Sequence, residues 1–229
     1  MSLDVRAFRH SPIIFDFDGV IVDSEVLAAR IYAEYLALSG IPITEAEVAA
    51  QFTGMRLIDS QKALEARHGI KFPVEFSDGL HAHGRTVFSR HLRAVRGAGS
   101  FIRKCGDRTI AIASSSTLEH IGHSLELVGL HDAFVGRCFS AAMLERGKPH
   151  PDIYLLAAEA LKVPASTCIA IEDSERGVAA AVAAGMYTIG LTAASHCHDG
   201  TAPALRAAGA HFIAASYGEV EHHLDPHGS

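Results

Sequence analysis

The 229-residue sequence contains only four cysteines, which lie about thirty residues apart and form no CxxC pair. Paired cysteines are typical of zinc sites and redox motifs, and dense cysteines are typical of small secreted folds. Neither class fits this spacing. We therefore expect Cys105, Cys138, Cys168 and Cys197 to be reduced, mostly buried thiols of a cytoplasmic protein.

The sequence also lacks a basic cluster and a long apolar segment. It has 20 Lys and Arg against 26 Asp and Glu, with a formal net charge of −6, so nucleic-acid binding is not expected. Its apolar runs fall short of the ~18–20 residues that span a membrane. The first residues, MSLDVRAFRHSP, lack the apolar core of a signal peptide. We expect no nucleic-acid partner, no membrane segment and a cytoplasmic location.

Histidine, in contrast, is abundant, with 15 residues. The densest group is HCHD at residues 196–199, which could in principle supply metal ligands. A metal site needs ligands that the structure positions, and this segment has the composition of a loop. We favour a loop without a metal.

Short apolar runs rich in β-forming residues recur along the chain and alternate with helical patterns such as residues 152–163 and 175–185. Strands that alternate with helices predict a parallel sheet covered by helices on both faces, in which each strand is a continuous apolar run. The sequence therefore indicates an α/β fold. The expected strands are residues 12–17, 109–114, 134–140, 168–173, 187–192 and 211–216.

One segment interrupts the alternation, because residues 24–91 show helical patterns without a strand pattern. We interpret 24–91 as an inserted all-helical domain, and residues 1–23 and 92–229 as the core domain. The expected helices start with an apolar stripe (Leu27, Ile31, Tyr35, Leu38) and a capping box (Thr44, Glu47), and continue over 57–69 and 75–92. An insertion after the first strand lies over the sheet edge where open α/β sheets bind ligands.

Polar side chains stand at or just beyond the ends of four expected strands. The carboxyl ends of parallel strands meet at one edge of a sheet, so these side chains can converge although about 160 residues separate the first from the last. They are Asp16 and Asp18 after the first strand, Ser114, Lys148, and Glu172 with Asp173.

This set suits phosphoryl transfer. A carboxylate can attack phosphorus and form an aspartyl phosphate, and a divalent cation with oxygen ligands offsets the repulsion between the carboxylate and the substrate. A hydroxyl and a lysine can bind the phosphoryl oxygens. A turn at Gly19 can direct Asp18 back to serve as general acid and base.

The motifs DFDGVIVDS, IAIASSS, GKPHPD and IAIEDSERG resemble, in this order, the four motifs of the haloacid dehalogenase (HAD) superfamily. The likeness covers essentially the whole chain. It is greatest to the branch with a helical cap between the first two motifs, which includes β-phosphoglucomutases and sugar-phosphate phosphatases. The resemblance implies a Rossmann-like parallel-sheet HAD core with an inserted all-helical cap.

The resemblance also implies roles for individual residues. Asp16 would be the nucleophile and Asp18 the general acid and base, while Ser114 and Lys148 would bind the phosphoryl group. Mg²⁺ would be held by Asp16, the backbone carbonyl of Asp18, and Asp173, with Glu172 in or next to the metal's coordination shell. Alternatives remain open: Ser115 or Ser116 in place of Ser114 as the phosphoryl ligand. Asp23 is expected to cap the first inserted helix or to orient the hinge before it, with a catalytic role less favoured.

Within this superfamily, Asp18 argues against haloacid dehalogenases and phosphonatases, which lack it, and P-type ATPases carry a lysine and a threonine that are missing here. Positions characteristic of β-phosphoglucomutases also differ, at Ala28, Thr53, Leu57, Thr117 and Leu118. The segment FTGMRLID, with Gly54 and Arg56, looks more like the 6-phosphogluconate phosphatase type. Arg56 could pair with a substrate carboxylate or second phosphate, or it could be a solvated arginine.

We therefore expect a Mg²⁺-dependent phosphatase that hydrolyses a small phosphomonoester, either a sugar phosphate or a phosphosugar acid. A β-phosphoglucomutase-type phosphomutase is the alternative, and a non-catalytic binding module is a more remote one. Gly54, Arg56 and Ser115 are the expected substrate-binding residues. We expect the chain to be a monomer or a weak dimer.

Overall fold

The computed structural model describes residues 10–52 and 55–225 and contains a six-stranded parallel sheet. Its strands are β1 (Ile13–Phe15), β2 (Ile110–Ser114), β3 (Cys138–Ser140), β4 (Ile169–Glu172), β5 (Tyr187–Leu191) and β6 (Phe212–Ala214). Their order across the sheet is β3-β2-β1-β4-β5-β6. The strand order reverses between β1 and β4, and open α/β sheets bind ligands at such a switch point.

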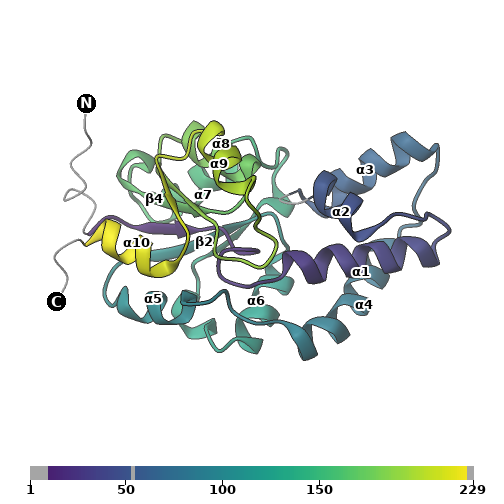
Figure 1. The fold of residues 1–229 in the computed structure, drawn as a ribbon, viewed down its shortest axis with the longest axis horizontal. Coiled ribbons are helices and arrows are strands. Elements are labelled where there is room, and N and C mark those ends of the chain that lie inside the picture. Colours follow the sequence, from purple (N-terminus) through teal and green to yellow (C-terminus); the bar gives the residue numbers. More distant parts are fainter. Residues whose placement is uncertain (1–9, 53–54, 226–229) are drawn as a thin grey trace.

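Helices cover both faces of the sheet, as Figure 1 shows. Ile13 and Phe15 of β1 are buried on one face and Ile14 on the other, because successive strand residues point to opposite sides. One layer holds α5 (Ala98–Lys104), α6 (Leu118–Leu127) and α10 (Tyr217–Leu224), and the other holds α7 (Asp152–Ala160), α8 (Glu175–Ala183) and α9 (Thr201–Ala207). The predicted α/β class with a Rossmann-like parallel sheet is confirmed.

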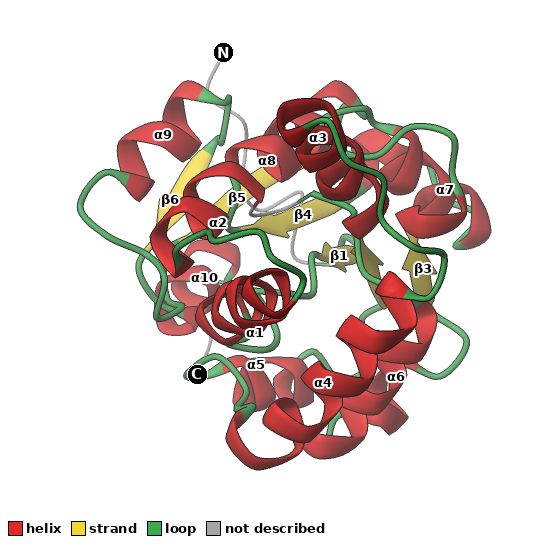
Figure 2. Cartoon of the chain, turned by 90° about the vertical axis from the view of Figure 1, so that its right-hand side faces the viewer, coloured by secondary structure: helices red, strands yellow, loops and turns green. Residues whose placement is uncertain are grey.

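Four helices separate β1 from α5, the first helix of the layers beside the sheet: α1 (Glu25–Leu38), α2 (Glu45–Phe52), α3 (Leu57–His68) and α4 (Phe76–His91). The described residues between 24 and 91 contain no strand. These helices gather at the end of the molecule opposite the two termini (Figure 1), and Figure 2 views them from that end. The division into a core and an inserted domain at 23/24 and 91/92 stays a prediction.

The buried face of α1 differs from the predicted stripe. Leu38 is 78% exposed, although it was expected to be part of the apolar face. Besides Ile31, the buried residues of α1 are Ala29, Tyr32, Ala33 and Leu36, which follow the i, i+3, i+4, i+7 spacing of one helix face. This face packs against α2 and α4. Ala29 and Ala33 therefore belong to the face of α1 that packs against α2 and α4, whereas Leu38 at the end of the helix does not.

Local signals in the sequence predicted some helix and strand limits but not all. The capping box is present, since Thr44 N donates to Glu47 Oε2 at 2.9 Å and Glu47 N donates to Thr44 Oγ1 at 3.2 Å. The strand expected over 134–140 is shorter, because residues 131–134 form a 3₁₀ turn and Gly136 has a φ of 69°. Only residues 138–140 pair with β2.

Asp23 contacts a loop of the sheet domain and does not cap α1. Its Oδ1 accepts hydrogen bonds from Ser195 N at 3.0 Å and Ser195 Oγ at 2.8 Å. Ser24 precedes α1 and makes no side-chain capping bond. Asp23 thus ties the beginning of α1 to the loop that follows β5.

The four cysteines are free thiols, but only Cys168 is fully buried. The expectation of mostly buried cysteines is therefore wrong for the other three, which are half-buried. Among the described residues, no helix combines the length and apolarity that crossing a membrane requires.

Candidate active site

The carboxyl ends of β1 and β4 bring three acidic side chains together at the switch point. Asp16 follows β1, Glu172 ends β4 and Asp173 comes next. One carboxylate oxygen of each lies within 4.8 Å of the others. Lys148, from the loop between β3 and α7, places Nζ 2.6 Å from Asp16 Oδ1 and 2.6 Å from Glu172 Oε1. The structure thus joins four of the predicted site residues.

The charges of this cluster do not balance, since one ammonium group faces three buried carboxylates. Burial raises the pKa of Asp16 well above its ordinary value and Lys148 opposes the shift, while Glu172 and Asp173 add to it. Burial, followed by repulsion from Glu172, likewise raises the pKa of Asp173. A second cation would relieve this repulsion.

Glu172 is fully occupied by hydrogen-bond donors. Its Oε1 accepts from Lys148 Nζ and from Tyr154 Oη, each at 2.6 Å. Its Oε2 accepts from the backbone N–H of Asp173 at 3.2 Å and from the N–H and hydroxyl of Ser174 at 3.4 and 3.2 Å. This geometry suits a residue that fixes Lys148 and the start of α8. A direct metal contact by Glu172 stays a prediction.

Asp173 differs from Glu172, because its Oδ2 is buried and makes no hydrogen bond with the described residues. Nε2 of His196 lies 3.2 Å from this oxygen. The backbone at Gly19, which has a φ of 75°, passes close to the Asp173 carboxylate. Only glycine allows this, because a Cβ at residue 19 would lie 1.7 Å from Asp173 Oδ2. A buried carboxylate oxygen that makes no hydrogen bond, and that lies beside the carboxylate of Asp16, has the chemistry of a Mg²⁺ ligand. The residues present therefore fit a divalent cation.

Asp18 lies beside this cluster and is held by hydroxyl groups. Ser24 Oγ donates to its Oδ1 and Ser116 Oγ to its Oδ2, both at 2.6 Å, and Nε2 of His120 lies 3.5 Å from Oδ1. Burial alone would raise the pKa of Asp18, but His120 and the two serines outweigh it and lower this pKa to about 2. Asp18 is therefore ionised at neutral pH and can accept a proton.

Three consecutive serines, Ser114 at the end of β2 and the two that follow it, have different hydrogen-bond partners. Ser114 is buried, and its Oγ accepts a hydrogen bond from Ser116 N at 3.0 Å. Ser116 donates to Asp18, while Ser115 lines the cavity with Ser114 and Ser116. Which of these hydroxyls binds a phosphoryl group stays a prediction.

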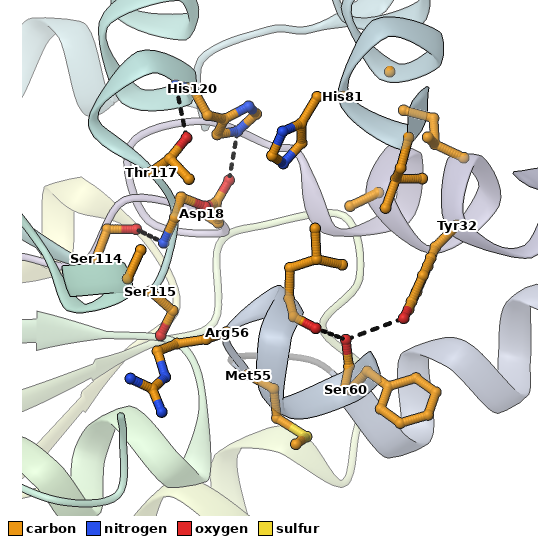
Figure 3. A pocket seen from close by; sticks show the side chains of 18 of the residues that line it. Asp18, Tyr32, Met55, Arg56, Ser60, His81, Ser114, Ser115, Thr117 and His120 are labelled. Carbon is orange, nitrogen blue, oxygen red and sulfur yellow. Dashed lines mark hydrogen bonds and ion pairs between the residues drawn. The ribbon is translucent and has the colours of Figure 1, made fainter. Parts of the chain in front are cut away.

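A cavity of about 420 Å³ opens above these residues and is covered by α1 to α4. Asp16, Asp18 and Lys148 line its floor, and side chains of the helical segment line the rest. Figure 3 shows Asp18, Ser114 and Ser115 on one side of this space and Tyr32 and Ser60 across it. The volume lies in the ~300–1,000 Å³ range of small-molecule sites.

Arg56 lines the cavity, but its guanidinium contacts the protein. Nε and Nη2 donate to Asp59 at 2.6 and 2.9 Å. Nη1 donates to the backbone carbonyls of Ala141 and Leu144, and Nη2 also donates to that of Glu145. All five N–H groups of an arginine are thereby used. The predicted substrate contact remains untested and would require some of these bonds to break.

Gly54, the third predicted substrate-binding residue beside Arg56 and Ser115, lies outside the described residues, as does Thr53. Among the described His, Cys, Asp and Glu residues, the one group arranged to hold a metal is Asp16, Glu172 and Asp173, and it includes no residue of the HCHD segment. The expectation that this segment is a loop without a metal stays a prediction.

Three residues that organise the site were not predicted from the sequence: Ser24, His120 and Tyr154. Thr117 caps α6 by accepting from His120 N at 3.2 Å, so His120 stands in the first turn of the helix that follows β2. A histidine four residues after the motif IAIASSS could have been recognised in the sequence as a residue that reaches the site. Tyr154 was concealed in the apolar pattern of α7, and only the fold brings it to Glu172.

Comparison with known proteins gives a family and several relatives. The model of the haloacid dehalogenase-like hydrolase family matches residues 13–185. The chain is 28% identical over 189 residues to 6-phosphogluconate phosphatase of Escherichia coli K12, covering 82% of this chain and 85% of the relative. It is 30% identical over 190 residues to hexitol phosphatase B of the same organism, covering 81% and 85%.

Solved structures extend the likeness. A HAD family hydrolase from Deinococcus radiodurans R1 with bound phosphate and sodium has a TM-score of 0.73 and 31% identity, covering 96% of each chain. A β-phosphoglucomutase from Clostridium difficile has a TM-score of 0.77 at 20% identity, covering 94% of this chain and 97% of that one. The second likeness shows the fold alone.

Proposed function

The chain belongs to the haloacid dehalogenase-like hydrolase family, and from this premise we propose that it is a Mg²⁺-dependent phosphatase of a small phosphorylated metabolite. One observation carries the proposal. The carboxylate of Asp16 lies at the floor of the cavity, 2.6 Å from Lys148 and beside an oxygen of Asp173 that makes no hydrogen bond with the described residues.

In the proposed reaction, an Asp16 oxygen forms a bond to phosphorus while the ester P–O bond breaks and the alcohol leaves with a proton from Asp18. Lys148 and a serine hydroxyl after β2 bind the phosphoryl oxygens. Water then attacks the phosphorylated Asp16, and Asp18 accepts its proton. Hydrolysis releases inorganic phosphate and restores the carboxylate. Because Asp18 is ionised in this structure, it must take up a proton before it can serve the first step.

Asp16 and Asp173 would hold the metal, together with the backbone carbonyl of Asp18 that the family resemblance implies. When bound, Mg²⁺ would supply the positive charge that lets an anionic nucleophile approach an anionic substrate. Glu172 keeps Lys148 in place for the same purpose.

The names of the relatives make sugar phosphates and phosphosugar acids the first substrates to assay. A β-phosphoglucomutase-type reaction is the alternative, but Ala28 and Thr117 line the cavity where that type carries other residues. We therefore expect inorganic phosphate as the main product if β-glucose 1-phosphate reacts. Conversion to glucose 6-phosphate faster than phosphate release, followed by NMR, would favour the mutase.

The direct test is phosphate release from p-nitrophenyl phosphate. Asp16→Asn should reduce turnover by roughly a hundredfold or more, because an amide is a poor nucleophile, and the fold should stay intact. Asp132→Asn is the matched control, since the Asp132 side chain is fully exposed, and it should leave turnover unchanged. Mg²⁺ should be required, and excess EDTA should stop the reaction. Phosphate release that survives both EDTA and Asp16→Asn would contradict the proposal.

A further inference from the structure

The two ends of the cavity differ in chemistry. Its floor carries carboxylates, hydroxyls and the ammonium group of Lys148. The described residues of the opposite walls come from α1, α2, residues 55–58, α3 and α4, and they present more hydrocarbon than polar surface. The main apolar side chains of these walls are Ile31, Phe52, Met55, Leu57, Leu80 and Phe88. A phosphomonoester bound with its phosphate at the floor would place its alcohol among them.

Several polar groups on these walls are already paired with one another. Tyr32 Oη and Ser60 Oγ are 3.1 Å apart, and Ser60 Oγ donates to the Leu57 carbonyl at 2.8 Å. Gln61 Nε2 donates to Ser77 Oγ at 3.1 Å. These paired groups have few hydrogen bonds left to give the hydroxyls of a sugar in place of those that water makes.

Arg85 and Arg56 do not change this picture. The five N–H groups of Arg56 bond to protein acceptors. Arg85 Nη1 lies 3.3 Å from Glu119 Oε1, and both side chains are more than half exposed, so this pair lies in contact with solvent. His81 faces the space (Figure 3), and burial lowers its pKa, which favours the neutral ring. Two more imidazoles line the cavity, His120 and His123, and His120 Nε2 is directed at Asp18 Oδ1, 3.5 Å away. Each imidazole can pair with one or two hydroxyls, which is fewer than the several hydroxyls of a hexitol chain require along walls that are mainly apolar.

The excess of apolar over hydrogen-bonding groups on these walls affects apolar and polar alcohols differently. Each hydroxyl that is buried without a partner weakens binding by roughly tenfold. Each methylene that moves from water into an apolar wall strengthens it by about fourfold. The walls therefore favour a hydrocarbon group over a polyol of similar size.

We propose that the substrate is the phosphate monoester of a largely apolar primary alcohol, such as an alkyl or arylalkyl alcohol, and not of a sugar or sugar acid. The inference rests on the proposed function for the phosphate end of the site. What the inference adds is the chemical class of the alcohol, which the apolar contacts of the cavity select.

The test compares esters that share the same leaving-group chemistry. In 2-phenylethyl phosphate, n-hexyl phosphate, glucose 6-phosphate and 6-phosphogluconate, phosphate is bonded to a primary carbon. With the unaltered protein and Mg²⁺, kcat/KM for the two apolar esters should exceed that for the sugar esters by roughly tenfold or more. Equal values, or a preference for either sugar ester, would overturn the inference.

A separate outcome would concern the proposed function. If no ester releases phosphate, p-nitrophenyl phosphate included, the protein is not a phosphatase, and the cavity is then tested by binding. Isothermal titration of the Asp16→Asn protein with Mg²⁺ should show 2-phenylethyl phosphate binding roughly tenfold tighter than glucose 6-phosphate. Equal or weaker binding would refute the inference without reference to turnover.

Met55 offers a variant with a matched control. It is half-buried and lines the cavity, whereas Met143 is 83% exposed and lies outside it. Met55→Gln should lower kcat/KM for 2-phenylethyl phosphate by roughly fivefold or more and leave glucose 6-phosphate unchanged or improved. Met143→Gln should change neither. An equal loss for both esters in Met55→Gln would contradict an apolar contact with the substrate. The comparison of esters uses the unaltered protein and decides the inference even if this variant does not fold.

Discussion

Replacing Lys148 by methionine removes the cation that holds the acidic cluster together. The Lys148 side chain is 2% exposed, and Nζ donates to Asp16 at 2.6 Å, to Glu172 at 2.6 Å and to the Ala113 carbonyl at 3.2 Å. Methionine fills a similar volume without charge or donors. The variant therefore leaves buried carboxylates that face one another with nothing to offset their repulsion.

The expected loss of unfolding free energy follows from these contacts. Two charge-assisted hydrogen bonds of about 1.5–3 kcal/mol each give about 3–6 kcal/mol. Removing one partner of a buried ion pair typically costs about 3–5 kcal/mol, which agrees. For a chain of this length, each kcal/mol lowers the Tm by about 2–4 °C. We expect Lys148→Met to lower the Tm by about 6–20 °C.

Thermal unfolding followed by circular dichroism in EDTA measures the Tm, and urea unfolding in the same buffer measures the free energy of unfolding. Lys71→Met is the control, because the Lys71 side chain is 87% exposed and its pair with Glu65 is at the surface, where such pairs contribute about 0–1 kcal/mol. Adding Asp16→Asn to Lys148→Met should recover part of the loss, since it removes one repelling charge. A loss no larger than that of Lys71→Met would refute this account of the cluster.

Gly19→Ala should abolish the rise in Tm on adding Mg²⁺, because its Cβ would lie 1.7 Å from Asp173 Oδ2. Gly40→Ala, also at positive φ but with no atom within 4 Å of the added Cβ, should keep that rise; an equal effect of both variants would mean that only backbone strain matters. Arg56→Ala should lower kcat/KM to the same extent for 6-phosphogluconate and for p-nitrophenyl phosphate, because the guanidinium binds Asp59 and backbone carbonyls. Arg30→Ala, at an exposed site, should change neither rate, and a selective loss for 6-phosphogluconate in Arg56→Ala would show that Arg56 contacts the substrate.

Much of the fold could be predicted from local patterns. The six strands lie within the predicted ranges, because a strand buried on both faces must be apolar throughout. The approximate place of Asp16, Lys148, Glu172 and Asp173 followed as well. Parallel strands end at one edge, so residues that follow them meet whatever the intervening sequence is. The capping box at Thr44 is equally local, since both partners lie within one helical turn.

The tertiary structure decided which partner each side chain has. Arg56 is surrounded by carbonyl groups 85 to 89 residues away, and no pattern around Arg56 specifies that contact. Glu172 and Asp173 are adjacent carboxylates, yet Tyr154 and Lys148 donate hydrogen bonds to the first, while the second keeps a buried oxygen that makes no hydrogen bond with the described residues. The apolar character of the cavity likewise depends on how four helices pack over the sheet. Sequence alone determined which elements form and which edge carries the chemistry, because hydrophobic periodicity and strand direction are local properties. Packing between distant segments determined the contacts, because the burial and hydrogen bonding of a side chain depend on every element that reaches it.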